Sequence, residues 1–212
     1  MASEPIRDPV NDHLLTPKNS AFVIIDYQPV QVNSVASMDR LQLVNNIVGT
    51  AKAAVAYGLP IVHSMANVKT GLNKPPISQL RKVLDGFPAY DRTTINAWED
   101  VEFRKAVEAT GRKKLIMTAL WTEACLTFPA LDALKEGYEV YVVADAVGGT
   151  SVTAHEMALR RIEQAGGKMI SLTQLLCELQ RDWQRKETVP AFMKLFIETG
   201  GTMGIQLSYD HD

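Results

Sequence analysis

A cysteine at the end of an apolar run is the residue of this chain best placed for chemistry. The run begins at Leu115 and gives way to Trp121-Thr-Glu, after which Cys125 stands where the pattern predicts a helix to begin. The first N–H groups of a helix are unpaired and its peptide dipoles are aligned, so negative charge is favoured there. A thiolate is stabilised at such a position, and Cys125 is therefore a candidate nucleophile.

Two charged residues are expected beside this cysteine. Asp26 directly follows the apolar run 21–25, and Arg92 lies near the end of a weaker run at 90–93. Ligands of open α/β sheets bind beyond the carboxyl ends of the strands, where residues distant in sequence meet. In such a group the cation and the helix start would lower the pKa of the thiol, and the carboxylate would carry its proton to a leaving group. N–H groups near Trp121 and Cys125 would form the oxyanion hole.

Each candidate also has a structural explanation. A carboxylate after a strand can cap the next segment, and an arginine is ordinarily a solvated or ion-paired surface group. Asn96 and Trp98 either line the pocket or fix the loop after the arginine. His63 lies within an apolar strand and is typical of a hydrogen-bonded core histidine. Cys177 falls on the apolar stripe of a predicted helix, so packing is its expected role.

The elements that must position these residues alternate along the chain. Short apolar runs are followed by longer amphipathic ones, which is the pattern of repeated βαβ units. We expect strands at 21–25, 60–64, 90–93, 114–119, 139–143 and 168–170, and helices at 41–57, 78–84, 99–109, 122–136 and 151–164, with another from residue 171 through Trp183. The predicted fold class is α/β, with a mostly parallel sheet of about six strands, helices on both faces and right-handed crossovers.

The expected organisation is one domain with two appendages. The domain spans 20–184, preceded by an N-terminal extension at 1–19 and followed by a C-terminal helix and tail at 185–212. The last segment is apolar, so it either forms an oligomer contact or packs back on its own domain.

Composition excludes several classes of function. The chain has 212 residues, is 46% hydrophobic and 22% charged, and carries a formal net charge of -2. These values are typical of a soluble globular protein and give no electrostatic footprint for nucleic acid. No apolar run is long enough for a membrane span, and residues 1–20 are too polar for a signal peptide, so a cytoplasmic location is expected. The two cysteines and four histidines lack disulfide-framework or metal-clip spacing.

Four ordered segments resemble one known group of enzymes. They are Phe22–Asp26, Thr94–Trp98, Ala119–Cys125 and Gly137–Ala146, and they are similar to those of the isochorismatase-like cysteine hydrolases, within them the YcaC-like branch. The resemblance runs from about residue 20 through residue 183. It implies a three-layer, Rossmann-like α/β/α fold and, because members of that branch tend to be high-order assemblies, a homo-oligomer.

The resemblance also implies a site. It places an Asp–basic–Cys triad on Asp26, Arg92 and Cys125, and a non-proline cis peptide bond between Leu120 and Trp121. Many family members have lysine at the basic position. Arginine does not release its proton, so here it could act only as fixed positive charge or as a carboxylate clamp.

Other departures bear on the pocket. Trp121 is bulkier than expected beside the nucleophile, which predicts a reshaped or partly blocked substrate pocket, bordered also by Asn96 and Trp98. The segment Ser64–Val68 supplies nothing like the Asp/His metal cluster of the nicotinamidases, so neither a metal nor another cofactor is expected.

The leading functional hypothesis is a cysteine hydrolase that cleaves an amide or related C–N bond of a small molecule. Cys125 would form a thioester, with Asp26 as general acid and base. Two alternatives stay open. One is hydrolysis of an isochorismate-like vinyl ether, which need not use the thiol. The other is a catalytically idle oligomeric protein with a binding or scaffold role.

Overall fold

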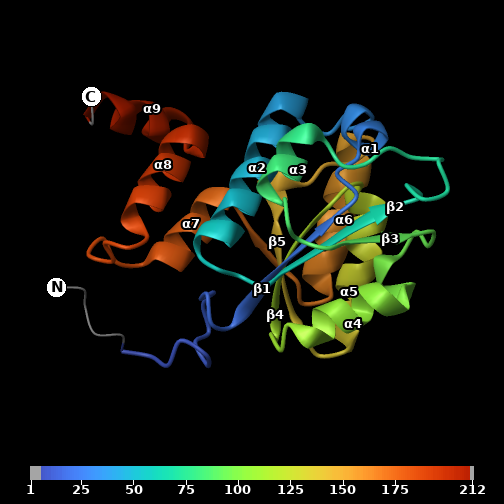
Figure 1. Cartoon of the computed structure of the whole chain (residues 1–212), viewed down its shortest axis with the longest axis horizontal. Helices are drawn as coiled ribbons and strands as arrows, with labels where there is room; N and C mark the ends of the chain where they lie inside the picture. The colour runs from blue at the N-terminus through green and yellow to red at the C-terminus, as the bar shows by residue number, and fades with distance from the viewer. Residues whose placement is uncertain (1–5, 211–212) are drawn as a thin grey trace.

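A parallel six-stranded sheet forms the centre of the protein (Figure 1). The structure, a computed structural model, describes residues 6–210. The spatial order is β3-β2-β1-β4-β5-β6, and every neighbouring pair is parallel. The strands are β1 (Ser20–Ile25), β2 (Ile61–Ala66), β3 (Ala89–Arg92), β4 (Lys114–Ala119), β5 (Glu139–Val143) and β6 (Lys168–Ile170). The predicted fold class is confirmed.

Helices cover both faces of this sheet. The α2, α3 and α7 helices pack on one face, and α4, α5 and α6 on the other (Figure 1). Successive strand side chains point to opposite faces, so Phe22 and Ile24 enter one apolar cluster while Val23 and Ile25 enter the other. The six helices are α2 (Arg40–Ala56), α3 (Ser78–Val83), α4 (Val101–Ala109), α5 (Thr127–Lys135), α6 (Val152–Gln164) and α7 (Leu172–Gln180).

Side-chain caps set where several helices begin. Asp39, Asp100, Ser151 and Ser171 each accept a hydrogen bond from a backbone N–H in the first turn of α2, α4, α6 and α7. Such caps satisfy N–H groups that have no partner within the helix. Short helical segments complete this part of the chain. The sequence pattern missed α1 (Pro29–Asn33) and η3 (Ala144–Ala146), whereas η1 (Ala97–Glu99) lies at the start of the helix predicted at 99–109 and η2 (Thr122–Leu126) lies within the helix predicted at 122–136.

The strand order reverses direction at the middle of the sheet, between β1 and β4. The connections that follow β1 lead toward β2 and β3, whereas those that follow β4 lead toward β5 and β6. At such a switch point the loops after two adjacent strands turn to opposite faces and leave room for a ligand. The loops after β1 and β4 carry Asp26 and Cys125.

The N-terminal segment is tied to the opposite edge of the sheet. The buried Lys114 ammonium donates hydrogen bonds to the carbonyl oxygens of Asp12 at 2.7 Å and His13 at 2.6 Å. The Asp12 carboxylate is paired with Arg181 just after α7. The Leu15 N–H also donates to Glu178 of α7, at 2.8 Å. Residues 12–15 therefore join the base of β4 to the end of α7.

The C-terminal region holds two helices where one was expected. They are α8 (Val189–Thr199) and α9 (Gly201–Asp210), and they extend away from the sheet (Figure 1). Phe192 and Leu195 of α8 are buried in the apolar cluster that contains α2. The predicted helix through Trp183 ends earlier, at Gln180, because Arg181 adopts a positive φ of 55°.

Two further findings concern the exposure of Cys177 and the search for membrane-spanning helices. The expectation of a packed Cys177 is wrong, because its side chain lies on the exposed side of α7. Within the described residues 6–210, no helix has the length and apolar character required to cross a lipid bilayer.

Candidate functional site

A buried ion pair joins the ends of β1 and β3. Arg92 Nη1 donates to Asp26 Oδ1 at 2.8 Å, and Arg92 Nη2 donates to Asp26 Oδ2 at 2.7 Å. The side chain of Arg92 is 0% exposed and that of Asp26 is 1% exposed. Two parallel hydrogen bonds between a planar guanidinium and a carboxylate fix orientation as well as charge. Asp26 itself has φ of 62°, a left-handed conformation that turns the chain sharply at the end of β1.

Other groups hold Arg92 in place. Its Nη1 donates to Ser64 Oγ at 3.1 Å, and its Nη2 donates to the Ile95 carbonyl at 3.1 Å. Burial lowers the pKa of Arg92 and the hydrogen bonds with Asp26 raise it, with a net rise. The guanidinium is thus a fixed positive charge. Sequence reasoning missed Ser64, whose only signal was a hydroxyl within an otherwise apolar strand.

Cys125 lies in a π-helical turn, η2, and not at the first turn of a regular helix. The turn spans Thr122–Leu126, and α5 begins only at Thr127. Cys125 is partly buried and packs against the apolar cluster on the α4–α6 face. The charges of both Asp26 and Arg92 act on its thiol.

The direction of the thiol's pKa shift contradicts the sequence-based expectation. Burial and the carboxylate of Asp26, through charge and a hydrogen bond, raise the pKa of Cys125 to about 12, whereas Arg92 and a backbone hydrogen bond from Trp121 lower it by less. The expected lowering is wrong because Asp26 neutralises the arginine and the apolar cluster excludes water. With its pKa raised in this way, the cysteine is a protonated thiol at neutral pH.

The segment before the cysteine is anchored from both sides. The Leu120–Trp121 peptide bond is cis. The Trp121 indole Nε1 donates to Ser34 Oγ at 2.8 Å and to the Gln31 carbonyl at 3.2 Å, so α1 and the residue after it hold the ring. This large side chain, predicted to reshape the pocket, is thereby fixed against the end of α1.

Hydrogen bonds also attach the η2 turn to the loop after β5 and to α6. The Thr122 N–H donates to the Gly148 carbonyl at 3.0 Å, and Thr122 Oγ1 lies 2.9 Å from His155 Nδ1. Glu123 Oε1 accepts from both the N–H and the hydroxyl of Thr150, at 2.9 and 2.6 Å. A side chain on Gly149 would collide with Glu123. The position of Cys125 therefore depends on residues 148–155.

Asn96 and Trp98 occupy structural positions. The Asn96 side chain accepts from the Trp98 N–H at 3.0 Å and donates to Asp132 of α5 at 2.7 Å. The Trp98 ring is 4% exposed and makes edge contacts with Phe103 and Tyr138. These contacts favour the loop-fixing alternative for Asn96, whereas the buried Trp98 Nε1 has no hydrogen-bond partner among the described residues.

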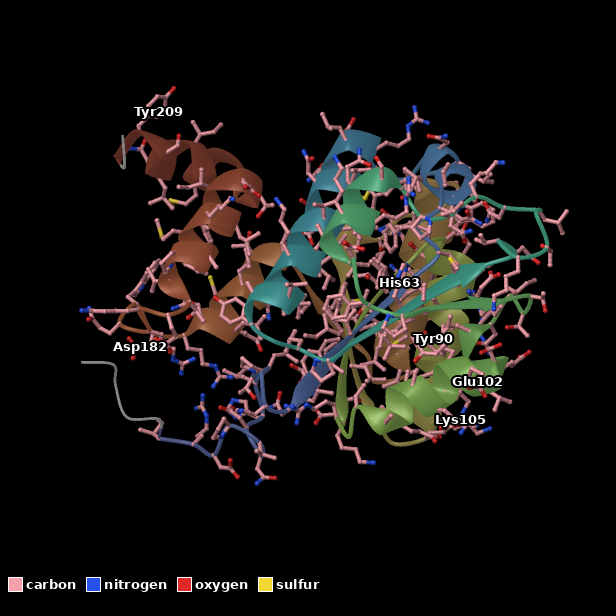
Figure 2. The ribbon with its side chains drawn as sticks, in the orientation of Figure 1. His63, Tyr90, Glu102, Lys105, Asp182 and Tyr209 are labelled. Carbon is pink, nitrogen blue, oxygen red and sulfur yellow. The ribbon has the colours of Figure 1, made fainter. Side chains whose placement is uncertain are left out.

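The remaining titratable candidates do not gather into a metal site. His63 lies in β2 within the sheet (Figure 2), and burial lowers its pKa to about 4, against an opposing effect of Asp26, so it is neutral at pH 7. Asp145, after β5, accepts from the Leu172 N–H at 2.8 Å and braces the start of α7. Across residues 6–210, no three side chains of the metal-ligating types lie together.

Comparison with known proteins identifies the family. Residues 20–174 match the family model of the isochorismatase domain. The chain belongs to the isochorismatase family. This match spans β1 through the start of α7 and so includes every strand of the sheet.

Isochorismatase-family proteins of the YcaC type are similar to it over nearly their whole length. "Probable hydrolase YcaC" of Escherichia coli strain K12 is 34% identical over 171 residues, which is 80% of this chain and 82% of that protein. The structure of YcaC from Pseudomonas aeruginosa, with hexane-2,5-diol and covalent acrylamide, superposes with a TM-score of 0.87 at 29% identity, covering 94% of this chain and 97% of that one. The structure of YcaC from Escherichia coli is described as an octameric hydrolase of unknown specificity. It superposes with a TM-score of 0.86 at 30% identity, and the match covers 99% of each chain.

Proposed function

We propose that this protein is a cysteine hydrolase that cleaves an amide or related C–N bond of a small molecule. The observation that carries the proposal is the buried, doubly hydrogen-bonded pair of Asp26 and Arg92 at the switch point of the sheet, whose charges act on the Cys125 thiol. It unites a nucleophile, a proton acceptor beside it and a fixed cation that orients the acceptor. The similarity to YcaC, named a probable hydrolase, supports the general reaction class.

The proposed reaction begins with proton transfer from the Cys125 thiol to Asp26 as sulfur attacks the substrate carbonyl. The N–H groups of Trp121 and Cys125 hold the oxyanion. As the C–N bond breaks, Asp26 returns the proton to the departing amine and a thioester remains. Water then attacks the thioester, gives one proton to Asp26, and releases the acid as that proton returns to sulfur.

The raised pKa of Cys125 fits this scheme. A thiol that keeps its proton at rest needs a base at the moment of attack, and Asp26 is the carboxylate whose charge acts on it. Arg92 holds the carboxylate in one orientation through two hydrogen bonds, so the base is already positioned before substrate arrives. Covalent acrylamide in the Pseudomonas aeruginosa relative indicates a reactive nucleophile in a protein of this type.

One alternative is favoured by a specific observation. A neutral, half-buried thiol beside a carboxylate already occupied by arginine is also what a catalytically idle binding or scaffold protein would contain. Vinyl ether hydrolysis, which the family name suggests, is the other alternative. We further propose a homo-oligomer, from the similarity to an octameric relative, and a cytoplasmic location.

The test is loss of the thiol. Cys125→Ala should abolish turnover of a panel of small primary amides and all covalent labelling by acrylamide at that position, because the nucleophile proposed to form the thioester is removed. Circular dichroism should show an unchanged fold. Cys177→Ala is the matched control, since Cys177 lies on the exposed side of α7, and it should retain full activity.

Two outcomes would point elsewhere. Full amide hydrolysis by Cys125→Ala would contradict the mechanism, and retained activity on a vinyl ether substrate would identify that chemistry instead. Absence of turnover in the wild type, together with absence of labelling at Cys125, would favour the idle alternative.

A further inference from the structure

Gln28 is a buried carboxamide, two residues after Asp26, that the proposed reaction does not use. The residue is 0% exposed. Its Oε1 accepts from the Ala66 N–H at 2.9 Å, and its Nε2 donates to the Ala66 carbonyl at 3.0 Å and to the Lys74 carbonyl at 2.7 Å. All three partners are backbone groups of the last residue of β2 or of the loop that follows it. The side chain therefore binds this segment at three points.

The two bonds to Ala66 replace bonds that a longer β1 would make. The ladder between β1 and β2 ends where Ile25 pairs with Ser64, and Asp26, with φ of 62°, then turns the chain away. Without Gln28, a buried N–H and a buried carbonyl of β2 would lose their partners, which is costly. A carboxamide offers a donor and an acceptor in one plane, as a peptide group does. Gln28 thus extends the ladder by one step beyond β1 itself.

The backbone that Gln28 holds is also the backbone that supports Arg92. Ala66 is the register partner of Arg92 in β3, and the Asn67 N–H donates to the Arg92 carbonyl at 2.9 Å. On its other side, the Gln28 N–H donates to the Asp26 carbonyl at 2.8 Å. One residue therefore links the backbone of Asp26 to the strand beside Arg92.

The ion pair of Asp26 and Arg92 depends on this link. Its hydrogen bonds, of 2.7 and 2.8 Å, join side chains at the ends of β1 and β3, which are not neighbours because β2 lies between them. A guanidinium and a carboxylate form two parallel bonds only in one relative orientation. A small displacement of one strand end would break that geometry, and a misplacement of about 1 Å can lower a catalytic rate by roughly 10²-fold.

We propose that Gln28 is a positioning residue for the reaction, whose carboxamide keeps the Asp26 carboxylate in place against Arg92. This inference rests on the function proposed above. Gln28 acts through the backbone of β2 and takes no part in proton transfer. Only a carboxamide makes all three bonds, because an ionised carboxylate accepts hydrogen bonds without donating any and an aliphatic side chain does neither.

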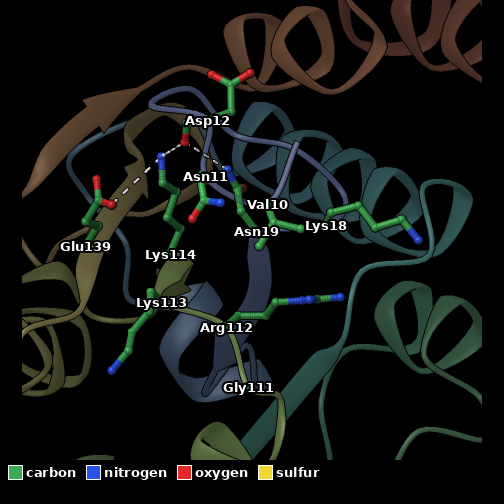
Figure 3. A pocket seen from close by; sticks show the side chains of 10 residues that line it. All are labelled: Val10, Asn11, Asp12, Lys18, Asn19, Gly111, Arg112, Lys113, Lys114 and Glu139. Atoms are coloured by element: carbon green, nitrogen blue, oxygen red, sulfur yellow. Dashed lines mark hydrogen bonds and ion pairs between the residues drawn. The ribbon is translucent and has the colours of Figure 1, made fainter. Parts of the chain in front are cut away.

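Asn19 provides a matched control at the other end of β1. Its buried carboxamide also makes three bonds with backbone groups: it accepts from the Thr16 N–H at 2.9 Å and donates to the carbonyl oxygens of Asp12 at 3.1 Å and Leu14 at 2.9 Å. Figure 3 shows the bond to Asp12. The whole length of β1 separates this side chain from the catalytic carboxylate. The two carboxamides are equally bonded and differ in which end of the strand they hold.

Gln28→Met and Asn19→Leu each remove one carboxamide and keep its approximate size. Both should lower the free energy of unfolding, measured in urea by circular dichroism. Only Gln28→Met should lower kcat for the amide panel, by roughly 10- to 100-fold with KM changed by less than about twofold, because a misplaced base weakens the transition state and not substrate binding. A crystal structure of Gln28→Met should show loss of at least one hydrogen bond between Asp26 and Arg92.

Three outcomes would overturn the proposal: an unchanged kcat in Gln28→Met, an equal fall of kcat in Asn19→Leu, or retention of both Asp26–Arg92 bonds at their wild-type lengths in the crystal. The crystal structure requires no turnover. A wild type that hydrolyses no amide would therefore contradict the proposed function, while the crystal would still decide whether Gln28 positions Asp26. Should Gln28→Met fail to fold, Gln28→Asn replaces it, because the shorter side chain cannot reach all three backbone groups, and a wild-type kcat in that variant would refute the role.

Discussion

The charge around Cys125 is set by two residues that cancel each other. Asp26 and Arg92 are both buried and share two hydrogen bonds, so the thiol meets a nearly neutral pair and not an isolated cation. Removing one partner of such a buried pair leaves an uncompensated charge, which typically costs about 3–5 kcal/mol. The same neutralisation keeps the sulfur protonated until a substrate arrives. Asp26 therefore governs both the reactivity of the thiol and its proton transfer.

Asp26→Asn separates these two effects. The change removes the negative charge that raises the pKa of Cys125 and leaves the positive charge of Arg92 beside the sulfur, so the pKa should fall. Alkylation of Cys125 by iodoacetamide at pH 8 should become faster, while amide turnover should drop by roughly 10²–10⁴-fold because the proton acceptor is lost. The rate of modification at each cysteine is followed by mass spectrometry from pH 6 to 10.

Cys177 provides an internal control for this measurement. It is exposed and distant from Asp26 along the fold, so its alkylation rate should be the same in both proteins. A Cys125 that reacts no faster in Asp26→Asn than in the wild type would show that the carboxylate does not hold the thiol in its protonated form.

His63 should make the protein sensitive to mild acid. Its pKa is about 4 when folded, against an ordinary 6.5 when unfolded, and burial is the main cause. A depressed pKa means that the unfolded state binds the proton first. The free energy of unfolding should therefore contain the full contribution of neutral His63 above pH 6.5. It should decline as pH falls toward 4, by up to about 3 kcal/mol.

Urea unfolding from pH 4 to 7 measures this effect. His63→Gln should flatten the pH dependence, because it removes the buried group that takes up the proton only on unfolding. The effect differs from that of Asp12 in its pH range. Because the pKa of Asp12 is lowered, its contribution to the free energy of unfolding is lost only below pH 4. An equal decline in His63→Gln and the wild type would refute the assignment.

The residues at this site illustrate what a sequence can and cannot predict. Asp26 and Arg92 were predictable because strand ends of a parallel sheet meet at one rim. The direction of the pKa shift of Cys125 was not predictable, because it depends on burial and on how two neighbouring charges cancel. Ser64 was also missed, since a hydroxyl in an apolar strand does not reveal which distant side chain it contacts.

At the scale of elements, the η2 turn positions Cys125. Its backbone is held by Gly148 and its first side chain, Thr122, is fully buried against His155. The Thr127 hydroxyl donates to the Thr122 carbonyl at 2.6 Å and joins the turn to α5. π-Helical turns are rare and often occur at functional sites. Apolar periodicity over 122–136 could not distinguish this turn from the regular helix that follows it.

Thr122→Val tests whether this attachment positions the thiol. Valine keeps the shape and the backbone hydrogen bonds but removes the hydroxyl that meets His155. We expect kcat to fall about tenfold with KM changed by less than about twofold, and stability to fall by about 1 kcal/mol. Thr122→Ser restores the hydroxyl and should restore kcat, and Thr153→Val, at an exposed position of α6, should have no effect. A serine variant as slow as the valine variant would assign Thr122 a purely packing role.

At the scale of the whole molecule, the two ends of the chain are joined to one side of the domain. The N-terminal segment pairs with Arg181 beside α7, and α8 packs on α2, with an ion pair of 2.7 Å between Lys52 and Glu198. The α/β repeat predicts the sheet but not these attachments, because they rest on single long-range pairs. The apolar pattern of the C-terminal segment predicts either an oligomer contact or packing on the domain. In the structure α8 packs, whereas α9 presents Met203, Ile205 and Tyr209 to solvent.

The exposed face of α9 gives the proposed homo-oligomer a specific test. Ile205 is 60% exposed and Tyr209 74%, and burying such side chains against a second copy would remove apolar area from water. Ile205→Asp should therefore shift the protein toward the mass of a single chain in sedimentation velocity at micromolar concentration. Val101→Asp, at a 63% exposed position on α4 away from α9, is the matched control and should sediment as the wild type does. A wild type that sediments as one chain would contradict the oligomer itself, whereas an Ile205→Asp variant that retains the wild-type mass would place the interface on another surface.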